Sequence, residues 1–312
     1  MKTHMSIQQQ KVLSPSALAL ALAIGLAGVF SAAHAGETQK TFATPEAAAQ
    51  ALATAARASD ERALEQILGA SWNDALSAGD AAADKAALHS FVTQYDQMHR
   101  WTAMTDGSRV LHIGADNYAY PVPLARDASS WHFDAAAGER EIGVRRIGAN
   151  ELLAIDAVNV IADAEEAYLD GARDDDTREY ATTIVSSDGK RDGLYWSATA
   201  SKEPSPLAAL GTLAADSATL GQPLVLDGYS YRILQAQGDT APGGAASYVK
   251  DGAMTGGFAV LASPVEYGSS GIMSFMLSRD GVVYQKDLGR QTVNVAATMT
   301  AYNPGDGWTS VE

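Results

Sequence analysis

The stretch FAVLASPVEYGSSGIMSFMLSRDGVVY, residues 258–284, indicates the architecture of the second half of this chain. Apolar residues here gather in short runs over 257–264, which begins one residue before the stretch, and over 272–278, and glycine-bearing turns separate these runs. Asp280-Gly281 lies between two apolar triplets, and an Asp-Gly pair in that setting is typical of a tight antiparallel hairpin. The stretch therefore predicts antiparallel strands.

The segments on either side of this stretch supply another strand and two helices. Residues 229–237 are strand-like, and residues 292–299 predict a short final helix. Upstream, Asn150 with Glu151 predicts a helix start, because both side chains suit a cap ahead of an apolar stripe. A long helix packed on an antiparallel sheet is the expected second unit. The stripe consists of Leu153, Ala157, Val160, Ile161, Ala164 and Tyr168.

Three helices, a small sheet and a fourth helix are expected in the first half. Thr44 offers a capping hydroxyl, Pro45 fits the first helical position and Glu46 favours the positive helix end, so a helix should run from there to about Ala58. Downstream the apolar period changes from three or four to two, which indicates strands. The other expected elements are helices over 59–69, 81–99 and 135–147, the last ending at Gly148, and strands over 109–113, 118–124 and 131–133.

Together these elements predict an α+β fold of two domains, each with helices packed on a small antiparallel sheet. A chain of 312 residues is long enough for two such cores, and 46% hydrophobic with 19% charged residues is the composition of a folded protein. The expected domains are residues 40–148 and 149–312. The sequence contains no internal repeat and no low-complexity linker.

Residues 1–35 have the parts of a secretory signal peptide. A positive start without acidic residues precedes an apolar run over 17–33, which is shorter than the roughly 20 residues that span a bilayer core. Ala33 and Ala35 match the small-residue pattern that signal peptidase accepts. Cleavage is therefore expected between Ala35 and Gly36, and the exported chain should keep no stable membrane anchor.

Cysteine is absent, which excludes lipid attachment after cleavage as well as disulfides, thiolate metal sites and cysteine nucleophiles. The formal charge of −15 argues against binding to nucleic acid or to anionic lipid. A soluble protein of the periplasm or the extracellular space is the resulting expectation.

No local pattern of catalysis or cofactor binding is present, so no catalytic residue, cofactor or metal is assigned. The chain lacks G-x-S-x-G and H-E-x-x-H, and its glycine pairs at 243–244 and 256–257 do not continue into a phosphate-binding loop. A catalytic triad built from distant residues stays open, because triads are recognised by geometry. Four histidines of the first domain have no metal-ligand spacing: His89, His99, His112 and His132.

The candidate binding site is a small-ligand cleft at the mouth of the first sheet. Aromatic side chains with one polar end suit such clefts, although the same residues also suit a hydrophobic core. The candidate residues are His99, Trp101, Tyr118, Trp131 and His132.

Several long segments resemble those of a family of exported bacterial proteins catalogued as a domain of unknown function. The resemblance extends from about Phe42 to Trp308 and implies export and a shared fold, and it transfers no catalytic residue. The segments are WHFDAAAGEREIGVRRIGANELLAIDA from Trp131, KRDGLYW from Lys190, GYSYRILQAQG from Gly228 and DGVVYQKDLG from Asp280.

Two further resemblances concern architecture. TPEAAAQAL from Thr44 and the WHF strand are similar to a small nuclear-transport-factor-like or cystatin-like domain. The second half, with NELLAIDAVNVIADAEEAY from Asn150 and GYSYRIL from Gly228, resembles the globular part of pilin-like proteins. It lacks the processed apolar N-terminal helix through which true pilins assemble.

The expected function is that of an exported, non-catalytic binding or envelope-interaction module whose partner is an envelope protein or a small ligand. The alternative is a hydrolase that acts on envelope material or on a small molecule with a site of dispersed polar residues. A pocket holding His99 or His132 within hydrogen-bond reach of a carboxylate would favour the hydrolase.

Overall fold

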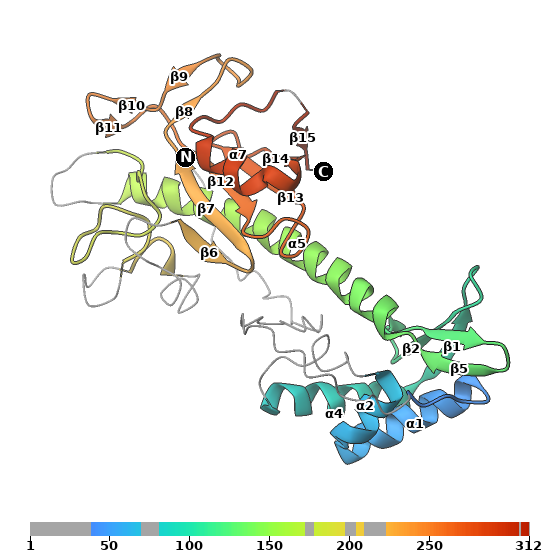
Figure 1. Cartoon of the computed structure of the whole chain (residues 1–312). Coiled ribbons are helices and arrows are strands. Elements are labelled where there is room, and N and C mark those ends of the chain that lie inside the picture. Colours follow the sequence, from blue (N-terminus) through green and yellow to red (C-terminus); the bar gives the residue numbers. More distant parts are fainter. Residues whose placement is uncertain are drawn as a thin grey trace, which may run out of the picture. The chain divides into compact units, whose positions relative to one another are not determined.

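The computed structural model describes residues 39–69, 81–171, 178–196, 204–208, 223–305 and 307–311. Within these residues the protein has the expected α+β fold of helices and antiparallel sheets (Figure 1). The chain divides into two compact units, Met1–Ile142 and Gly143–Glu312. The expected signal peptide and its cleavage site at Ala35 and Gly36 lie outside the described residues.

In its described residues the first unit has three helices ahead of its sheet, and local capping chemistry sets the starts of the first two. The Thr44 hydroxyl accepts a hydrogen bond from the backbone N–H of Ala47 at 3.1 Å, as expected. The second helix does not begin at residue 59 as expected, because Ser59 ends the first helix in the left-handed region with φ of 49°. Asp60 caps the second helix through the N–H of Ala63. The helices are α1 (Pro45–Ala58), α2 (Glu61–Leu68) and α4 (Ala81–Gln97).

The sheet of the first unit has the strand order β1-β2-β4-β5, with β3 paired to β2. The expected strand over 118–124 is two separate strands, because Pro121 and Pro123 have no N–H to contribute to a ladder. The expected third helix stops short of His99, which begins an unexpected strand. The strands are β1 (His99–Ala103), β2 (Arg109–Ile113), β3 (Tyr118–Ala119), β4 (Leu124–Asp127) and β5 (Ser130–Phe133).

One face of this sheet packs against the helices. Leu111, Leu124 and Phe133 are fully buried on that face together with apolar residues of α1 and α2 such as Leu52 and Leu64. Because side chains alternate between faces along a strand, the neighbours of these residues point to the opposite face. The two faces therefore carry different chemistry.

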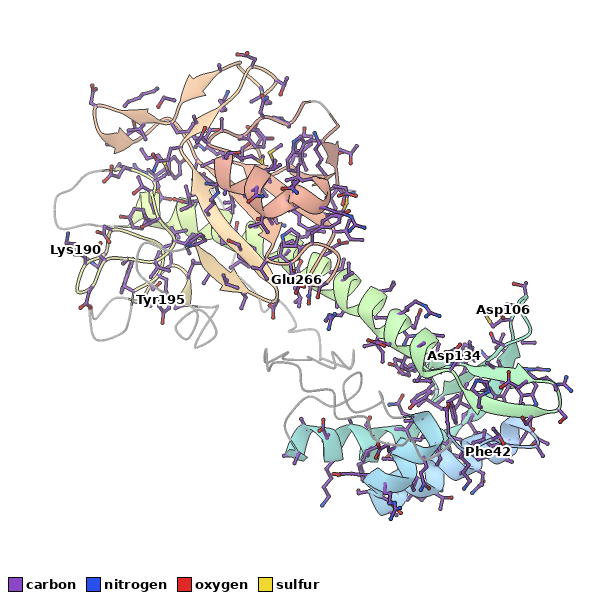
Figure 2. All side chains as sticks on the ribbon, viewed as in Figure 1. Phe42, Asp106, Asp134, Lys190, Tyr195 and Glu266 are labelled. Atoms are coloured by element: carbon purple, nitrogen blue, oxygen red, sulfur yellow. The ribbon has the colours of Figure 1, made fainter. Side chains whose placement is uncertain are left out.

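Helix α5 (Ala135–Asp170) is continuous, so the expected break at Gly148 and the expected new start at Asn150 are wrong. Asp134 caps its first turn by accepting from the N–H of Ala137 at 2.9 Å (Figure 2). A glycine inside a helix costs only about 1 kcal/mol relative to alanine, and packing of the apolar stripe offsets that cost. The boundary between the two units falls within this helix. None of the helices in the described ranges has the length and apolar character needed to cross a membrane.

The sheet of the second unit has the order β15-β14-β13-β12-β7-β6, and every pairing is antiparallel. The Asp280-Gly281 hairpin is confirmed: Gly281 has φ of 76° and donates to the carbonyl of Ser278 at 2.9 Å. The strands are β6 (Leu224–Leu226), β7 (Tyr229–Leu234), β12 (Ala259–Pro264), β13 (Met273–Ser278), β14 (Val283–Asp287) and β15 (Thr309–Ser310). Two short ladders pair β8 (Ala236–Gln237) with β9 (Ala246–Ser247) and β10 (Val249–Lys250) with β11 (Ala253–Met254).

Helices lie on both faces of this second sheet, α7 (Thr292–Thr298) in front and the second-unit part of α5 behind in Figure 1. All six residues of the central strand β12 are therefore buried. Arg232 of β7 donates to the carbonyls of Ala296 and Met299 and so satisfies the end of α7. The final helix expected over 292–299 is confirmed.

Candidate functional site

The five residues of the expected cleft do not share one surface. Trp131 lies on the helix-covered face of the first sheet with Phe133, and His132 between them points to the opposite face. Trp101 is on the helix-covered side, since it pairs with the fully buried Leu111. The structure thus separates His132 from both tryptophans.

His99 and Tyr118 lie in one row across the strands, because both pair with Ile113 of β2. The His99 ring stacks on Tyr95 with 4.0 Å between centroids, and its Nδ1 lies 2.9 Å from the Tyr95 carbonyl oxygen. These contacts give His99 a structural partner. Tyr118 is 40% exposed.

Trp101 contributes a buried donor. Its ring packs against the apolar clusters of the first unit, and its Nε1 atom is buried without a hydrogen-bond partner among the described residues. An unsatisfied buried N–H costs about 1 to 3 kcal/mol. The Trp101 donor is therefore one part of the expected cleft that has an unmet bonding capacity.

His132 is the residue on which the hydrolase alternative depends. Its Nδ1 atom lies 3.1 Å from Oδ2 of Asp127, yet the pair lacks the alignment of a hydrogen bond. The Asp127 side chain is 74% exposed, so water screens this contact. The two residues form a surface ion pair when His132 is protonated.

A group of cations surrounds two aromatic rings at one end of the first sheet, and we call it the cationic cluster: Lys40, Phe42, Arg109, Arg126 and Trp131. The guanidinium carbons of Arg109 and Arg126 lie 5.9 and 5.6 Å from the Trp131 ring centroid. The Lys40 ammonium lies 5.7 Å from the centroid of Phe42. All three contacts are within the range of cation–π attraction.

Backbone pairing positions the two rings of the cationic cluster side by side. Phe42 and Trp131 exchange two hydrogen bonds, of 2.7 and 2.8 Å, so that Phe42 (labelled in Figure 2) extends the sheet beyond β5. Arg126 of β4 lies directly opposite Trp131 of β5. Arg109 of β2 lies opposite Leu124, which is two residues before Arg126 along β4. All these side chains are on the helix-covered face.

The two arginines of the cationic cluster have no carboxylate partner within the described part of the chain. Other arginines do pair with acids: Arg57 with Asp96, Arg178 with Asp170 and Arg279 with Glu166. Arg126 is exposed and Arg109 half-buried, while Trp131 is only 8% exposed. The indole thus supports the guanidinium groups from below, and their N–H donors stay available.

Sequence reasoning missed Lys40, Phe42, Arg109 and Arg126. The sequence contained one signal for the two arginines. Arg109 is two residues from the buried Leu111 and Arg126 is two residues from Leu124, so each arginine lies on the same sheet face as a buried residue. A charged residue in the inward phase of a half-buried strand is uncommon and marks a position that needs a partner.

A second group of charged residues lies in the second unit. Glu165 of α5 is fully buried, and its Oε2 accepts from the backbone N–H of Ala181 at 2.8 Å. Next to it, the Tyr180 hydroxyl donates to Glu166 Oε1 at 3.3 Å, and Arg279 Nε lies 3.3 Å from the same oxygen. These contacts fasten the end of α5 to the strand region, which is a structural role.

This second group predicts a loss of stability at high pH. Burial, and then the Glu166 carboxylate, raise the pKa of Tyr180 from 10.0 to about 12. A raised pKa stabilises the folded state fully below pH 10, and this contribution is lost as the pH rises through about 12. Urea unfolding at several pH values between these limits should show falling stability, and Tyr180→Phe should make the fall shallower. An equally steep fall in the variant would contradict the assignment.

The described residues contain no group of three histidine, aspartate or glutamate side chains placed to hold a metal ion.

A family model described as "Protein of unknown function (DUF2950)" matches residues 39–311. No curated protein and no solved structure matches the chain. The resemblances to nuclear-transport-factor-like, cystatin-like and pilin-like folds therefore have no support from these comparisons.

Proposed function

The chain belongs to the DUF2950 family, and we propose that it is an exported, soluble, non-catalytic binding protein of the cell envelope. The observation that carries the binding role is the cationic cluster. Two guanidinium groups with free donors, held over an indole, suit the recognition of a partner. Export is supported by the signal-peptide pattern over residues 1–35.

Export has a direct test. The protein is expressed in a Gram-negative host and recovered from the exported fraction, and its intact mass is measured under denaturing conditions. The mass should correspond to a chain that begins at Gly36, because Ala33 and Ala35 fit the peptidase site. Retention of the full chain in the cytoplasm would contradict export, and a matched Ala35→Arg variant should block the processing.

The binding role is tested on the same exported material by native mass spectrometry. A binding protein should retain an envelope protein or a small molecule that is released unchanged when the chain is denatured. Variants of Arg109 and Arg126 should lose that added mass. Release of a chemically converted compound that accumulates with time would identify an enzyme instead.

The hydrolase is the second candidate, and one contact favours it, the 3.1 Å approach of His132 Nδ1 to Asp127 Oδ2. A His-Asp pair orients an imidazole as a general base in many hydrolases. If this pair is catalytic, His132→Gln should abolish turnover of an ester or glycoside test substrate at unchanged stability. Equal turnover in the variant would remove this candidate.

A further inference from the structure

We propose that the cationic cluster is a binding site for a small organic dianion, a phosphate monoester or a dicarboxylate. The proposal rests on the proposed binding function and names the chemical class of its ligand. The proposal is based on the positions of three cations. Arg109 and Arg126 both lie over the indole of Trp131, and Lys40 lies over the neighbouring ring of Phe42.

The bonding capacity of the two guanidinium groups selects an oxyanion. Each group offers five N–H donors in a planar fork that matches the oxygens of a carboxylate or a phosphate. A cation–π contact engages the positive charge with the face of the ring and forms no N–H···O bond, so the donors remain for a ligand. Hydrogen bonds between ionised partners are shorter and about twice as strong as neutral ones.

The charge of the cluster points to a dianion. Two guanidinium groups and one ammonium group concentrate here on a chain whose formal charge is −15. Neighbouring cations repel one another, and an anion between them removes that repulsion. A ligand with two negative charges neutralises more of the cluster than a monoanion of the same size.

The position of the cluster is fixed before any ligand arrives. Arg126 and Trp131 are direct cross-strand partners, and Trp131 is fastened to Phe42 by two backbone hydrogen bonds. Because the indole is 8% exposed and packed in the core, it restricts the rotamers of the arginines above it. Preorganised donors lose less conformational entropy on binding.

Isothermal titration calorimetry at low ionic strength tests the proposal with the full exported chain. The probes are glycerol phosphate and succinate, with glycerol as the neutral reference. We expect one of the two dianions to bind with a dissociation constant on the order of 1 mM or below. Arg126→Gln and Arg109→Gln should each weaken it about tenfold, which is the loss of one charge-assisted pair.

Matched variants distinguish binding at the cationic cluster from a nonspecific effect of the protein's charge. Arg100→Gln removes an arginine on the opposite face of the same sheet, where it donates to Asn117, and should change the affinity less than twofold. Arg126→Lys keeps the charge and loses the fork, so it should bind with intermediate affinity, and it also serves where the glutamine variant fails to fold.

Absence of binding by both dianions at about 10 mM would overturn the proposal, as would equal binding of glycerol or an equal effect of Arg100→Gln. Preference for glycerol phosphate or for succinate decides between the phosphate and the carboxylate class. If native mass spectrometry still shows a retained partner while neither dianion binds, the binding function stands and only this ligand class fails.

Discussion

Replacing Gly271 with alanine is expected to lower the free energy of unfolding of the second unit by about 3 kcal/mol, at the upper end of what overpacking costs. A Cβ atom at this position would overlap the hydroxyl oxygen of Tyr229 and lie 2.6 Å from its Cζ. Tyr229 is fully buried, and its hydroxyl donates to the carbonyl of Met273 at 2.8 Å. The ring has no space to move aside without losing that bond.

Gly268 in the same loop is the matched control. It has φ of 78°, and a Cβ there would meet nothing within 4 Å, so Gly268→Ala should cost only about 1 kcal/mol of backbone strain. Urea unfolding followed by circular dichroism measures both variants. Equal destabilisation by the two substitutions would show that Tyr229 does not restrict this position. The loop itself, marked by Glu266 in Figure 2, joins β12 to β13.

Replacing Glu151 with alanine is expected to cost about 3 kcal/mol, because it leaves two backbone donors without a partner. Glu151 Oε1 accepts from the N–H groups of both Ile272 and Met273, each at 2.9 Å. Both donors are partly buried at the start of β13, where water replaces the carboxylate only in part.

Glu151→Gln tests whether the accepted hydrogen bonds, and not the negative charge of Glu151, stabilise the loop. Glutamine keeps a carbonyl oxygen in the place of Oε1, so this variant should lose about 1 kcal/mol or less. The same unfolding experiment compares the two variants, and the amide proton signals of Ile272 and Met273 should exchange faster with solvent in the alanine variant alone. Comparable losses in both variants would show that the charge, and not the accepted hydrogen bonds, stabilises the loop.

The helices and hairpins that depend on local chemistry were predictable from the sequence. Thr44-Pro45 starts α1, and Asp280-Gly281 turns between β13 and β14, since a capping hydroxyl and a positive φ are requirements of a few adjacent residues. The α+β class follows from the change of apolar period, which needs no knowledge of distant contacts.

The continuity of α5 was not predictable from local pattern. Gly148, Asn150 and Glu151 have the residue types of a helix end followed by a new start. The polar side chains of Asn150 and Glu151 instead bind a loop more than a hundred residues away: Asn150 donates to the Ser270 carbonyl at 2.8 Å, and Glu151 accepts from Ile272. A polar residue that serves a tertiary contact looks the same in the sequence as one that serves a cap.

The grouping of the cationic cluster was also not predictable from the sequence, for a different reason. The aromatic residues of the expected cleft were recognised by type, and Trp131 is part of the cluster. Its partners come from three other segments, at Phe42, Arg109 and Arg126, which only strand pairing brings together. Pairing register depends on the whole sheet, so residue type alone cannot group them.

The pairing of Phe42 with Trp131 has a consequence for how the first unit avoids self-association. The outer side of β5 would otherwise present unpaired backbone groups, and such an edge is a template for strands of other molecules. The segment at residues 40–42 covers part of this edge, and the charge of Lys40 there opposes further strand addition. A chain truncated so that it lacks these residues would expose an aggregation-prone edge.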